Sequence, residues 1–270
     1  MRISRRTFLK RTLAAGIFLG AGSVAYAGGY GRHGIDITRV PLDLGVGRPL
    51  RVGLLSDIHF DPLYETAYLE HAFRLLAAEQ PDLVLHAGDF VSHTTHRFEE
   101  FGALAARFIP PLGAFAALGN HDHWAGPKKV RAILERHGIR VLRNSALPLP
   151  GHPGWFVAGL ESYWGGHPDP SFFARYPATA RFLAIVHEPD AWDRLPDPRI
   201  RLQVSGHTHG GQVRAPLFGA LQLPKWGKRY DAGLFHGRDD RHLYVTRGLG
   251  TVGLPVRFDC PPEITILELT

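Results

Sequence analysis

Five short polar clusters contain most of the side chains in this sequence that could do chemistry. They are Ser56–His59, Gly88–Phe90, Gly119–Asp122, His187–Asp190 and Gly206–His209. Together they supply carboxylate, amide and imidazole groups, a mixed oxygen and nitrogen set that suits Mn, Fe or Zn better than Ca. The sequence has one cysteine, Cys260, so a zinc site built from paired thiolates is excluded. The clusters therefore predict metal binding through His, Asp and Asn.

The plausible ligands are more numerous than one metal ion needs. Taken alone, each cluster is also explained as a polar turn, because Asn and Asp often bond their own backbone. Taken together, they indicate two metals that share a carboxylate. We expect Asp57 and His59 to project to the same side of an extended strand. The glycines before Asp89, Asn120 and His207 are expected to let the backbone turn sharply. The seven candidate ligands are Asp57, His59, Asp89, Asn120, His187, His207 and His209.

Each cluster follows an apolar run that is typical of a buried strand. In the first half, strands at 51–55, 83–87 and 114–118 alternate with amphipathic helices at 66–79, 98–108 and 128–137. This alternation indicates βαβ units. After residue 140 the pattern predicts a mixed or antiparallel sheet, with strands at 155–160, 182–186, 200–204, 242–246 and 263–269. We expect one α/β domain over residues 28–270, in which two sheets pack face to face with helices outside.

The first 27 residues have the composition of an export signal. Paired arginines at 5 and 6 precede an apolar run from Leu13 to Val24, and Ala25-Tyr26-Ala27 resembles a cleavage site. The apolar run is shorter than the roughly 20 residues that span a bilayer. We therefore predict a twin-arginine (Tat) signal peptide over 1–27, which makes the Tat machinery a partner. The protein would reach the periplasm or the extracytoplasmic face of the cell envelope. A retained membrane anchor is the alternative.

The net charge of +6 is concentrated in this N-terminal segment. Five of the 31 basic residues lie in the first 11 positions, which leaves 26 basic and 25 acidic residues for the rest of the chain. A body that is nearly neutral gives no electrostatic reason to expect nucleic-acid binding.

In succession, the clusters SDIH, GDFV, GNHD, HEPD and GHTH resemble the calcineurin-like metallophosphoesterase superfamily. Later segments at 206–212, 247–250, 253–255 and 261–263 are similar to a bacterial branch of exported or membrane-associated phosphodiesterases, which includes UDP-2,3-diacylglucosamine pyrophosphatase-like proteins. The resemblance implies a four-layer αββα double β-sandwich. It also implies a first metal held by Asp57, His59 and His209, a second held by Asn120, His187 and His207, and Asp89 as the bridge.

The resemblance further implies that a hydroxide bridging the two metals attacks phosphorus. His121 would protonate the leaving group, and Asp122 would hold the His121 ring in position. We predict a dinuclear phosphodiesterase that acts on a cell-envelope or lipid-linked phosphate. The alternatives are a periplasmic phosphomonoesterase or nucleotidase, and a noncatalytic metal-binding or cell-wall-binding envelope protein. Loops at 164–167 and 224–230 combine aromatic and basic residues, and Trp226 is a candidate for peripheral membrane contact.

Overall fold

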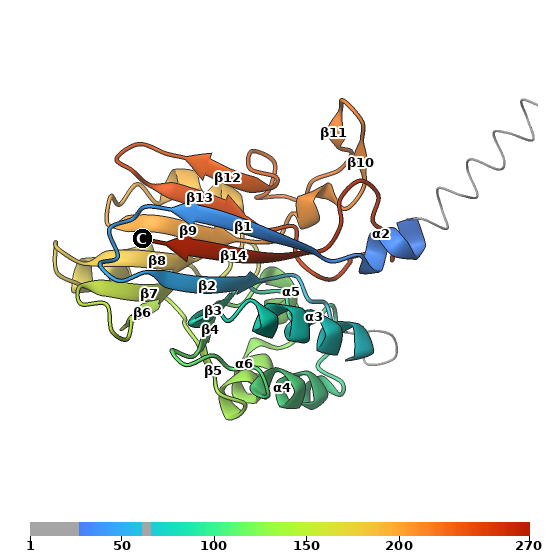
Figure 1. Cartoon of the computed structure of the whole chain (residues 1–270), viewed down its shortest axis with the longest axis horizontal. Helices are drawn as coiled ribbons and strands as arrows, with labels where there is room; N and C mark the ends of the chain where they lie inside the picture. The colour runs from blue at the N-terminus through green and yellow to red at the C-terminus, as the bar shows by residue number, and fades with distance from the viewer. Residues whose placement is uncertain (1–26, 61–65) are drawn as a thin grey trace, which may run out of the picture.

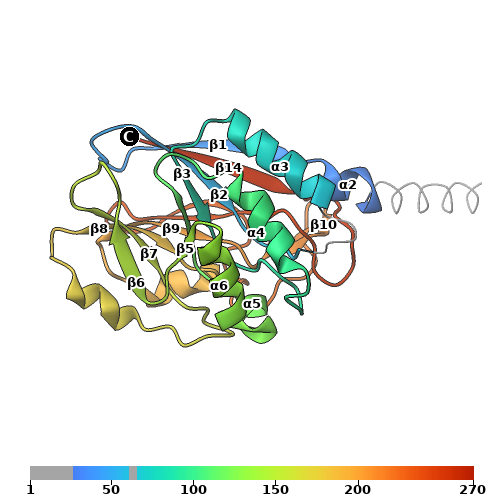
Figure 2. The same cartoon turned by 90° about the horizontal axis from the view of Figure 1, so that it is seen from below.

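The computed structural model describes residues 27–60 and 66–270 of the chain (Figure 1). Two six-stranded sheets form the body of the molecule, and α-helices cover the outer face of the first sheet (Figure 2). The predicted signal peptide falls on residues 1–26, which lie outside the described residues, so it stays a prediction. Within the described ranges, no helix has both the length and the apolar character needed to cross a bilayer.

The first sheet holds the βαβ units that the sequence predicts. Its strands, in spatial order, are β1 (Asp36–Leu42), β14 (Glu263–Leu269), β2 (Leu50–Leu55), β3 (Leu83–His86), β4 (Ala114–Ala116) and β5 (Ile139–Val141). Strands β2 to β5 are mutually parallel. They are connected through α3 (Thr66–Ala78), α4 (Phe98–Ala106) and α6 (Pro127–Arg136). These helices bury apolar faces on the sheet, with Phe73, Phe101 and Val130 among the residues packed there.

The second sheet is mixed, as predicted. Its strands, in spatial order, are β12 (Gly233–His236), β13 (His242–Val245), β9 (Ile200–Ser205), β8 (Arg181–Ile185), β7 (Trp155–Gly159) and β6 (Ser145–Pro148). The four central strands are parallel, and the two edge strands are antiparallel to their neighbours. Its outer face is covered by two 3-10 helices, η1 (Pro170–Arg175) and η2 (Pro189–Arg194), which contribute Phe172 and Trp192 to an apolar cluster.

A fully buried apolar layer joins the two sheets. Leu54 and Phe115 of the first sheet lie in the same cluster as Leu183 and Val204 of the second. The double β-sandwich that the sequence predicts is therefore confirmed. Short 3-10 segments, rather than α-helices, form the outer layer beside the second sheet.

Three local features differ from the expectation. The strand at 263–269 forms, but it lies in the first sheet, where β14 separates β1 from β2. A short helix, α5 (Asn120–Ala125), replaces the loop expected after β4. The pattern also did not show strands β1, β5, β6 and β12, the 3-10 helices η1 and η2, or four small elements: α2 (Tyr30–His33), η3 (His209–Gly211), β10 (Arg214–Ala215) and β11 (Gly219–Ala220). Short elements have too few residues to show a hydrophobic period, so sequence patterns do not reveal them.

Candidate metal centre

The five polar clusters meet because their strands end at one edge of the sandwich. Strands β2, β3 and β4 are adjacent and parallel, so the clusters that begin at Ser56, Gly88 and Gly119 lie at neighbouring carboxyl ends. Strands β8 and β9 are likewise adjacent and parallel in the facing sheet, and bring the clusters at His187 and Gly206 to the same edge. All seven predicted ligands are buried, each with at most 5% of its surface exposed.

The backbone at the centre turns through left-handed residues, whereas the sequence predicted an extended strand at Asp57 and His59. Asp57 and His59 have φ values of 51° and 48°, so they occupy the left-handed region and are not successive positions of an extended strand. Asp89, His207 and His209 also have positive φ. Such residues are strained, and strain of this kind clusters at functional sites. The convergence of Asp57 and His59 therefore comes from turning the chain, and the prediction of strand alternation was wrong.

Gly88 turns the chain before Asp89 as predicted, with a φ of 92°, whereas Gly119 and Gly206 allow other groups to approach closely. A Cβ atom at Gly119 would overlap the Asp89 carboxylate, and one at Gly206 would overlap Ser56 Oγ and an oxygen of Asp57. Gly119 itself has an ordinary φ of −89°. Any larger residue at these two positions would push the carboxylate ligands apart.

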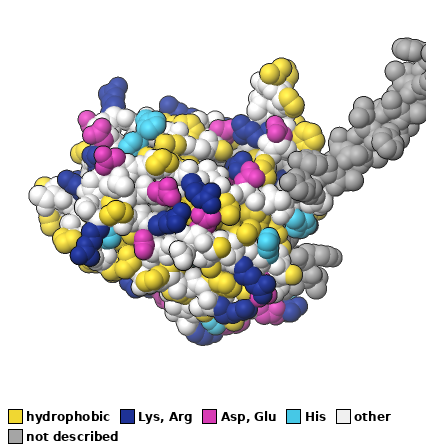
Figure 3. Space-filling model, in the orientation of Figure 1, with side chains coloured by type: hydrophobic (Ala, Val, Ile, Leu, Met, Phe, Trp, Pro, Cys, Tyr) yellow, Lys and Arg dark blue, Asp and Glu magenta, His cyan; other side chains and the backbone are white. Residues whose placement is uncertain are grey.

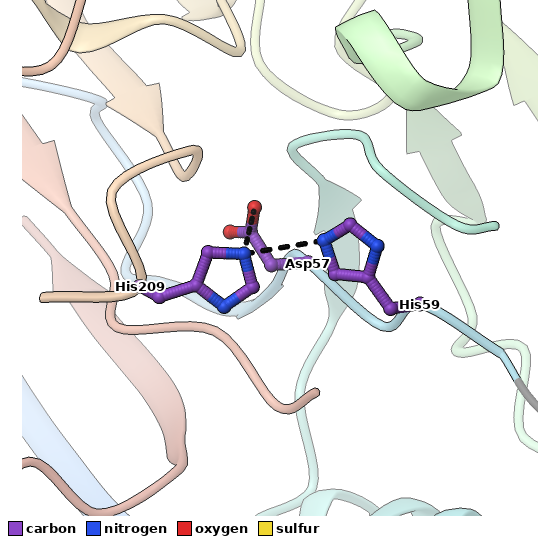
Figure 4. Close-up of side chains that lie close together, drawn as sticks. All are labelled: Asp57, His59 and His209. Atoms are coloured by element: carbon purple, nitrogen blue, oxygen red, sulfur yellow. Dashed lines mark hydrogen bonds and ion pairs between the residues drawn. The ribbon is translucent and has the colours of Figure 1, made fainter. Parts of the chain in front are cut away.

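Asp57, His59 and His209 form the first group of candidate ligands, and one ligand atom from each lies within 4.8 Å of the other two. His209 Nε2 lies 3.5 Å from Asp57 Oδ1 and 3.2 Å from His59 Nε2 (Figure 4). The three side chains point at a common space from two different sheets, because Asp57 and His59 follow β2 while His209 follows β9. This is the first set that the sequence predicted.

Asp89, His187 and His207 form a second group, again with ligand atoms within 4.8 Å of one another. Asp89 Oδ2 lies 3.2 Å from His187 Nε2 and 3.7 Å from His59 Nε2. The same carboxylate oxygen therefore faces a histidine of each group, which is the position of a bridging ligand.

Each of three histidines has one ring nitrogen fixed by a partner outside the centre. His187 Nδ1 donates to the Ala87 carbonyl at 2.6 Å, and His207 Nε2 donates to the Lys225 carbonyl at 2.7 Å. His59 Nδ1 lies 3.2 Å from Ser92 Oγ. The other ring nitrogen of each is thereby left to face the centre. Metal-binding histidines commonly use this arrangement, which sets both the tautomer and the ring orientation.

Asn120 supplies the clearest test of whether a metal fits. Its side chain is buried, and neither its oxygen nor its nitrogen has a hydrogen-bond partner among the described residues. A buried amide without a partner is costly, and proteins rarely leave one unsatisfied. His209 Nδ1 is also buried without a partner among these residues. The donor set, the shared Asp89 oxygen and the unpartnered Asn120 together fit a pair of divalent cations.

Burial shifts the pKa values of carboxylate and imidazole ligands in opposite directions, and neighbouring charges can outweigh it. Burial raises the pKa of Asp57 to about 7 and lowers that of His59 to about 3. Burial would also raise the pKa of Asp89, but the charge and hydrogen bond of His187, with the neighbouring charges of His59 and His121, outweigh it and lower the pKa. Asp89 is thus held as the anion, which suits a carboxylate shared between two cations.

The structure places His121 at the centre but gives Asp122 a different role. His121 is half-buried, and its Nδ1 donates to the Ser92 carbonyl at 2.7 Å, so Ser92 orients the ring. His121 also lies within ligand range of His59 and Asp89, a grouping that the sequence did not indicate.

The Asp122 carboxylate accepts hydrogen bonds from the backbone amides of Phe90, Val91 and Gly119. Asp122 therefore ties the loop after β3 to the loop after β4. The prediction that it holds the His121 ring was wrong, because its oxygens are directed to these amides.

Two acidic residues of the HEPD cluster position loops over the centre, a role the sequence analysis missed. Glu188 is buried and accepts hydrogen bonds from Ser162 Oγ and from the amides of Tyr163 and Trp164. Asp190 accepts from the amides of Lys228, Arg229 and Tyr230. The sequence feature that could have indicated this role is the pair of carboxylates, Glu188 and Asp190, that follows the candidate ligand His187.

The later segments brace the loop that carries Asp57. The amides of Leu249 and Gly250 donate to the carbonyls of Ser56 and Asp57. Glu263, from the segment at 261–263, accepts from the amide of Arg247 at 2.9 Å. These segments therefore stabilise the loop that carries Asp57, a residue of the first ligand group.

The candidate lipid-contact residue Trp226 is packed against the protein. Its ring lies 5.4 Å from the ring of Tyr163, and the Arg194 guanidinium lies 4.9 Å from its centroid. By contrast, Trp164 reaches the centre, 5.6 Å from the ring of His207. The loop at 164–167 thus approaches the centre, and the aromatic residue of the other loop serves packing.

A cleft of about 670 Å³ opens onto the centre. One end is lined by polar residues of the centre, among them Asp89, Asn120 and His121. The other end is lined by apolar residues that include Leu221, Val252 and Leu254. The cleft therefore joins the ligand groups to an apolar mouth.

Comparison with known proteins gives relatives along the whole chain. The chain is 31% identical to the uncharacterized metallophosphoesterase YkuE of Bacillus subtilis (strain 168), an alignment that covers 99% of this chain and 98% of the relative. It is 32% identical to phosphodiesterase YaeI of Escherichia coli (strain K12), in an alignment that covers 99% of both chains.

Solved structures of similar fold include a 5'-nucleotidase precursor from Thermus thermophilus, at 15% identity and a TM-score of 0.47, covering 75% of this chain and 49% of that one. A dimetal phosphatase from Danio rerio is 12% identical with a TM-score of 0.45, covering 74% of this chain and 88% of that one. The model of the calcineurin-like phosphoesterase family matches residues 50–211, a range that contains all seven predicted ligands. On this match and on the relatives that align along its whole length, the chain belongs to the calcineurin-like phosphoesterase family.

Proposed function

We propose that the protein is a dinuclear phosphodiesterase of the cell envelope that acts on a lipid-linked or other envelope phosphate. The observation that carries the proposal is the pair of ligand groups that share Asp89, with the buried Asn120 amide beside them left without a partner among the described residues. Such a donor set has no evident structural use, because packing alone would favour apolar residues at this depth.

Two divalent cations bound here would activate water and polarise the phosphoryl oxygens of the substrate. Asp57, His59 and His209 would hold one cation, and Asn120, His187 and His207 the other, with Asp89 between them. The chain itself then has to position the ester, exclude bulk water and deliver a proton to the leaving oxygen. Mn, Fe and Zn all suit the mixed donor set.

His121 is the residue that we assign to proton delivery. Its Nδ1 is held by the Ser92 carbonyl, so Nε2 is the nitrogen that can meet the leaving oxygen. His121 lines the cleft, and its backbone amide donates to Asp89 Oδ1 at 2.9 Å. A general acid needs its ring to be fixed in this way, because the proton has to be transferred over a hydrogen-bond distance.

The diester assignment is supported by the shape and lining of the cleft. The cleft is lined both by residues of the ligand groups and by Leu221, Val252 and Leu254, so it can take an apolar substituent of the ester as well as the phosphate. Trp164, whose loop is held by Glu188, gives one wall an aromatic surface. The relative YaeI is named a phosphodiesterase, which agrees with this assignment.

The envelope location is inferred from the sequence before Gly28. Paired arginines, a short apolar run and a small-residue site are the features of a Tat signal. The similarity of the later segments to exported phosphodiesterases, including UDP-2,3-diacylglucosamine pyrophosphatase-like proteins, supports the same location. N-terminal sequencing of exported protein should begin near Gly28, and a start at Met1 would contradict cleavage.

The test of activity compares two soluble esters. Purified protein loaded with Mn, Fe, Zn or Mg is assayed for kcat/KM on bis-p-nitrophenyl phosphate and on p-nitrophenyl phosphate, then on UDP-sugar lipids. The proposal expects the diester to be preferred. Preference for the monoester would favour a phosphomonoesterase or nucleotidase, and metal uptake without turnover would favour a noncatalytic binding protein.

A further inference from the structure

Exposed apolar residues lie at the mouth of the cleft and at the tip of the β10–β11 hairpin beside it. We define the rim as Leu217, Phe218, Leu221, Val252 and Leu254. The Leu217 side chain is fully exposed, and Phe218, Leu254 and Leu221 are 86%, 72% and 65% exposed. Five large apolar residues gathered in this way are unusual on a free surface, where such patches commonly mark an interaction site.

The two segments that form the rim contain no charge. Residues 215–224 and 248–256 hold no Asp, Glu, Lys or Arg, although 21% of the whole chain is charged. The first segment includes the tip of the hairpin formed by β10 and β11, which projects from the body of the molecule (Figure 1). Apolar side chains are visible on this projection (Figure 3).

Hydrogen bonds join the two segments into one surface. Gln212, at the base of the hairpin, accepts from the Val252 amide and donates to the Leu254 carbonyl at 2.8 Å. The backbone beside it also pairs with Phe258. Leu217 has a φ of 70°, a left-handed conformation that a glycine would adopt at lower cost. The rim is therefore a built structure that keeps a leucine at its tip.

The described chain begins beside this rim. The Ala27 carbonyl accepts a hydrogen bond from the Arg257 amide, directly after the rim segment at 248–256. The residues before Ala27 contain five basic side chains and an apolar run, by sequence alone. In Figure 1, helix α2 and the hairpin lie at the same end of the molecule. A lipid surface that held the N-terminal segment before its cleavage would thus also meet the rim.

We propose that the rim docks the protein on a lipid bilayer, with the mouth of the cleft facing the headgroups. Leu217 and Phe218 would enter the boundary between headgroups and acyl chains, where apolar side chains of peripheral proteins are stabilised. Lys225 and Lys228 are exposed in the loop that follows the hairpin, so they can meet anionic headgroups. A phosphodiester in a headgroup then reaches the centre without leaving the bilayer.

Fluorescence of a labelled cysteine measures this docking directly. Cys260 is buried, so a thiol-reactive, environment-sensitive dye will label a Leu217→Cys variant of the full chain at residue 217. The control is Leu147→Cys, on the distant edge strand β6, where an exposed leucine lies outside the cleft. The probes are vesicles of phosphatidylethanolamine and phosphatidylglycerol, with and without a nitroxide lipid.

The expected result is a blue shift and nitroxide quenching at residue 217, with an unchanged spectrum at residue 147. If both dyes stay in water while the protein binds vesicles, the N-terminal segment alone carries the contact and the proposal is overturned. If the dye at 217 stays in water and no vesicle binding occurs, the rim serves another partner, which also overturns it.

A paired substitution tests the function of the rim. The double substitution Leu217→Asp and Phe218→Asp should lower vesicle affinity at least about tenfold, because it removes two apolar side chains that the bilayer would bury. Turnover of a vesicle-embedded phosphodiester should fall with it, whereas kcat/KM for soluble bis-p-nitrophenyl phosphate should not change. Unchanged vesicle affinity would contradict docking, and the soluble assay reports the proposed phosphodiesterase activity separately.

Discussion

The two ends of the cleft differ in which groups lack a partner among the described residues. Buried polar atoms lack one at the inner end, and exposed apolar side chains lack one at the outer end. At the inner end, the buried Asn120 amide has an oxygen and a nitrogen that no described residue satisfies. At the outer end, Leu221 and Leu254 expose apolar surface that no described residue covers. Both are costly in isolation, the first through lost hydrogen bonds and the second through apolar contact with water. Each cost indicates a partner of the matching chemistry, namely cations inside and lipid outside.

Substitution at the inner end should have the largest effect. Asp89→Asn keeps the size of the side chain but removes the charge shared by the two ligand groups. We expect kcat/KM for bis-p-nitrophenyl phosphate to fall about 10⁴-fold, because the metals supply several kcal/mol of transition-state stabilisation. Elemental analysis should show lost metal. Asp43→Asn, at an exposed carboxylate, is the control, and comparable losses in both variants would contradict the assignment.

The second prediction separates His121 from its neighbours by leaving group. His121→Ala should slow an alkyl phosphodiester about 10² to 10³-fold, the usual contribution of a general acid. The p-nitrophenyl ester has a good leaving group and needs less help, so its rate should change much less. Steady-state kcat for the two esters measures the difference, and equal losses would remove the assigned role.

The third prediction tests the corrected role of Asp122. Asp122→Asn should destabilise the protein by about 1–3 kcal/mol, since a backbone amide of the two joined loops loses its acceptor. Denaturant unfolding of the metal-free protein measures this change. Because the effect is on loop position, both types of ester should be slowed equally; a selective loss on the alkyl ester would restore the original assignment.

The fourth prediction concerns pH at the inner end. Burial raises the pKa of Asp57 to about 7 in the metal-free protein, above its value in the unfolded chain. The folded protein thus binds this proton more tightly, so Asp57 lowers the free energy of unfolding as pH rises from about 4 to about 7.

Metal binding has to displace that proton. Affinity for Mn²⁺ should therefore be at least about tenfold lower at pH 6 than at pH 8. Calorimetric titration at the two pH values, with the protons released measured from buffers of different ionisation enthalpy, provides the check. Equal affinities would show that Asp57 is ionised before the metal arrives.

The smallest effect is expected at the outer end. Leu254→Ser should raise KM for a lipid-linked diester by about tenfold at most, because one apolar side chain leaves the contact. It should leave kcat for the soluble diester unchanged. If the soluble activity falls as well, the outer end of the cleft does not have a function separate from that of the inner end.

The residues of the centre could be predicted from the sequence because the ligand types stand beside strands that apolar runs mark clearly. Strand ends at 55, 86 and 185 are within a residue or two of the expected positions, so the clusters are brought to one edge by sheet topology. The prediction of which sheet holds residues 263–269 was wrong, because an apolar run shows that a strand forms but not which neighbour it pairs with.

The way the side chains are held could not be predicted from residue types. The left-handed conformations of Asp57 and His59 depend on hydrogen bonds from distant segments, such as the bonds of Leu249 and Gly250 to the same loop. The role of Asp122 depends on backbone amides that are equally present beside every residue. The packing of Trp226 depends on Tyr163 and Arg194, and nothing in the local sequence at 224–230 indicates them.

The place of β14 has a consequence for the order of events during biosynthesis. Asp36 of β1 pairs with Glu263, and β14 alone joins β1 to β2. A ribosome that synthesises the chain from its amino end delivers β1 and β2 long before β14, so β2 keeps an open edge until residues 263–269 emerge. Since the loop with Asp57 directly follows β2, the sheet edge beside this candidate ligand is completed only when residues 263–269 have joined it.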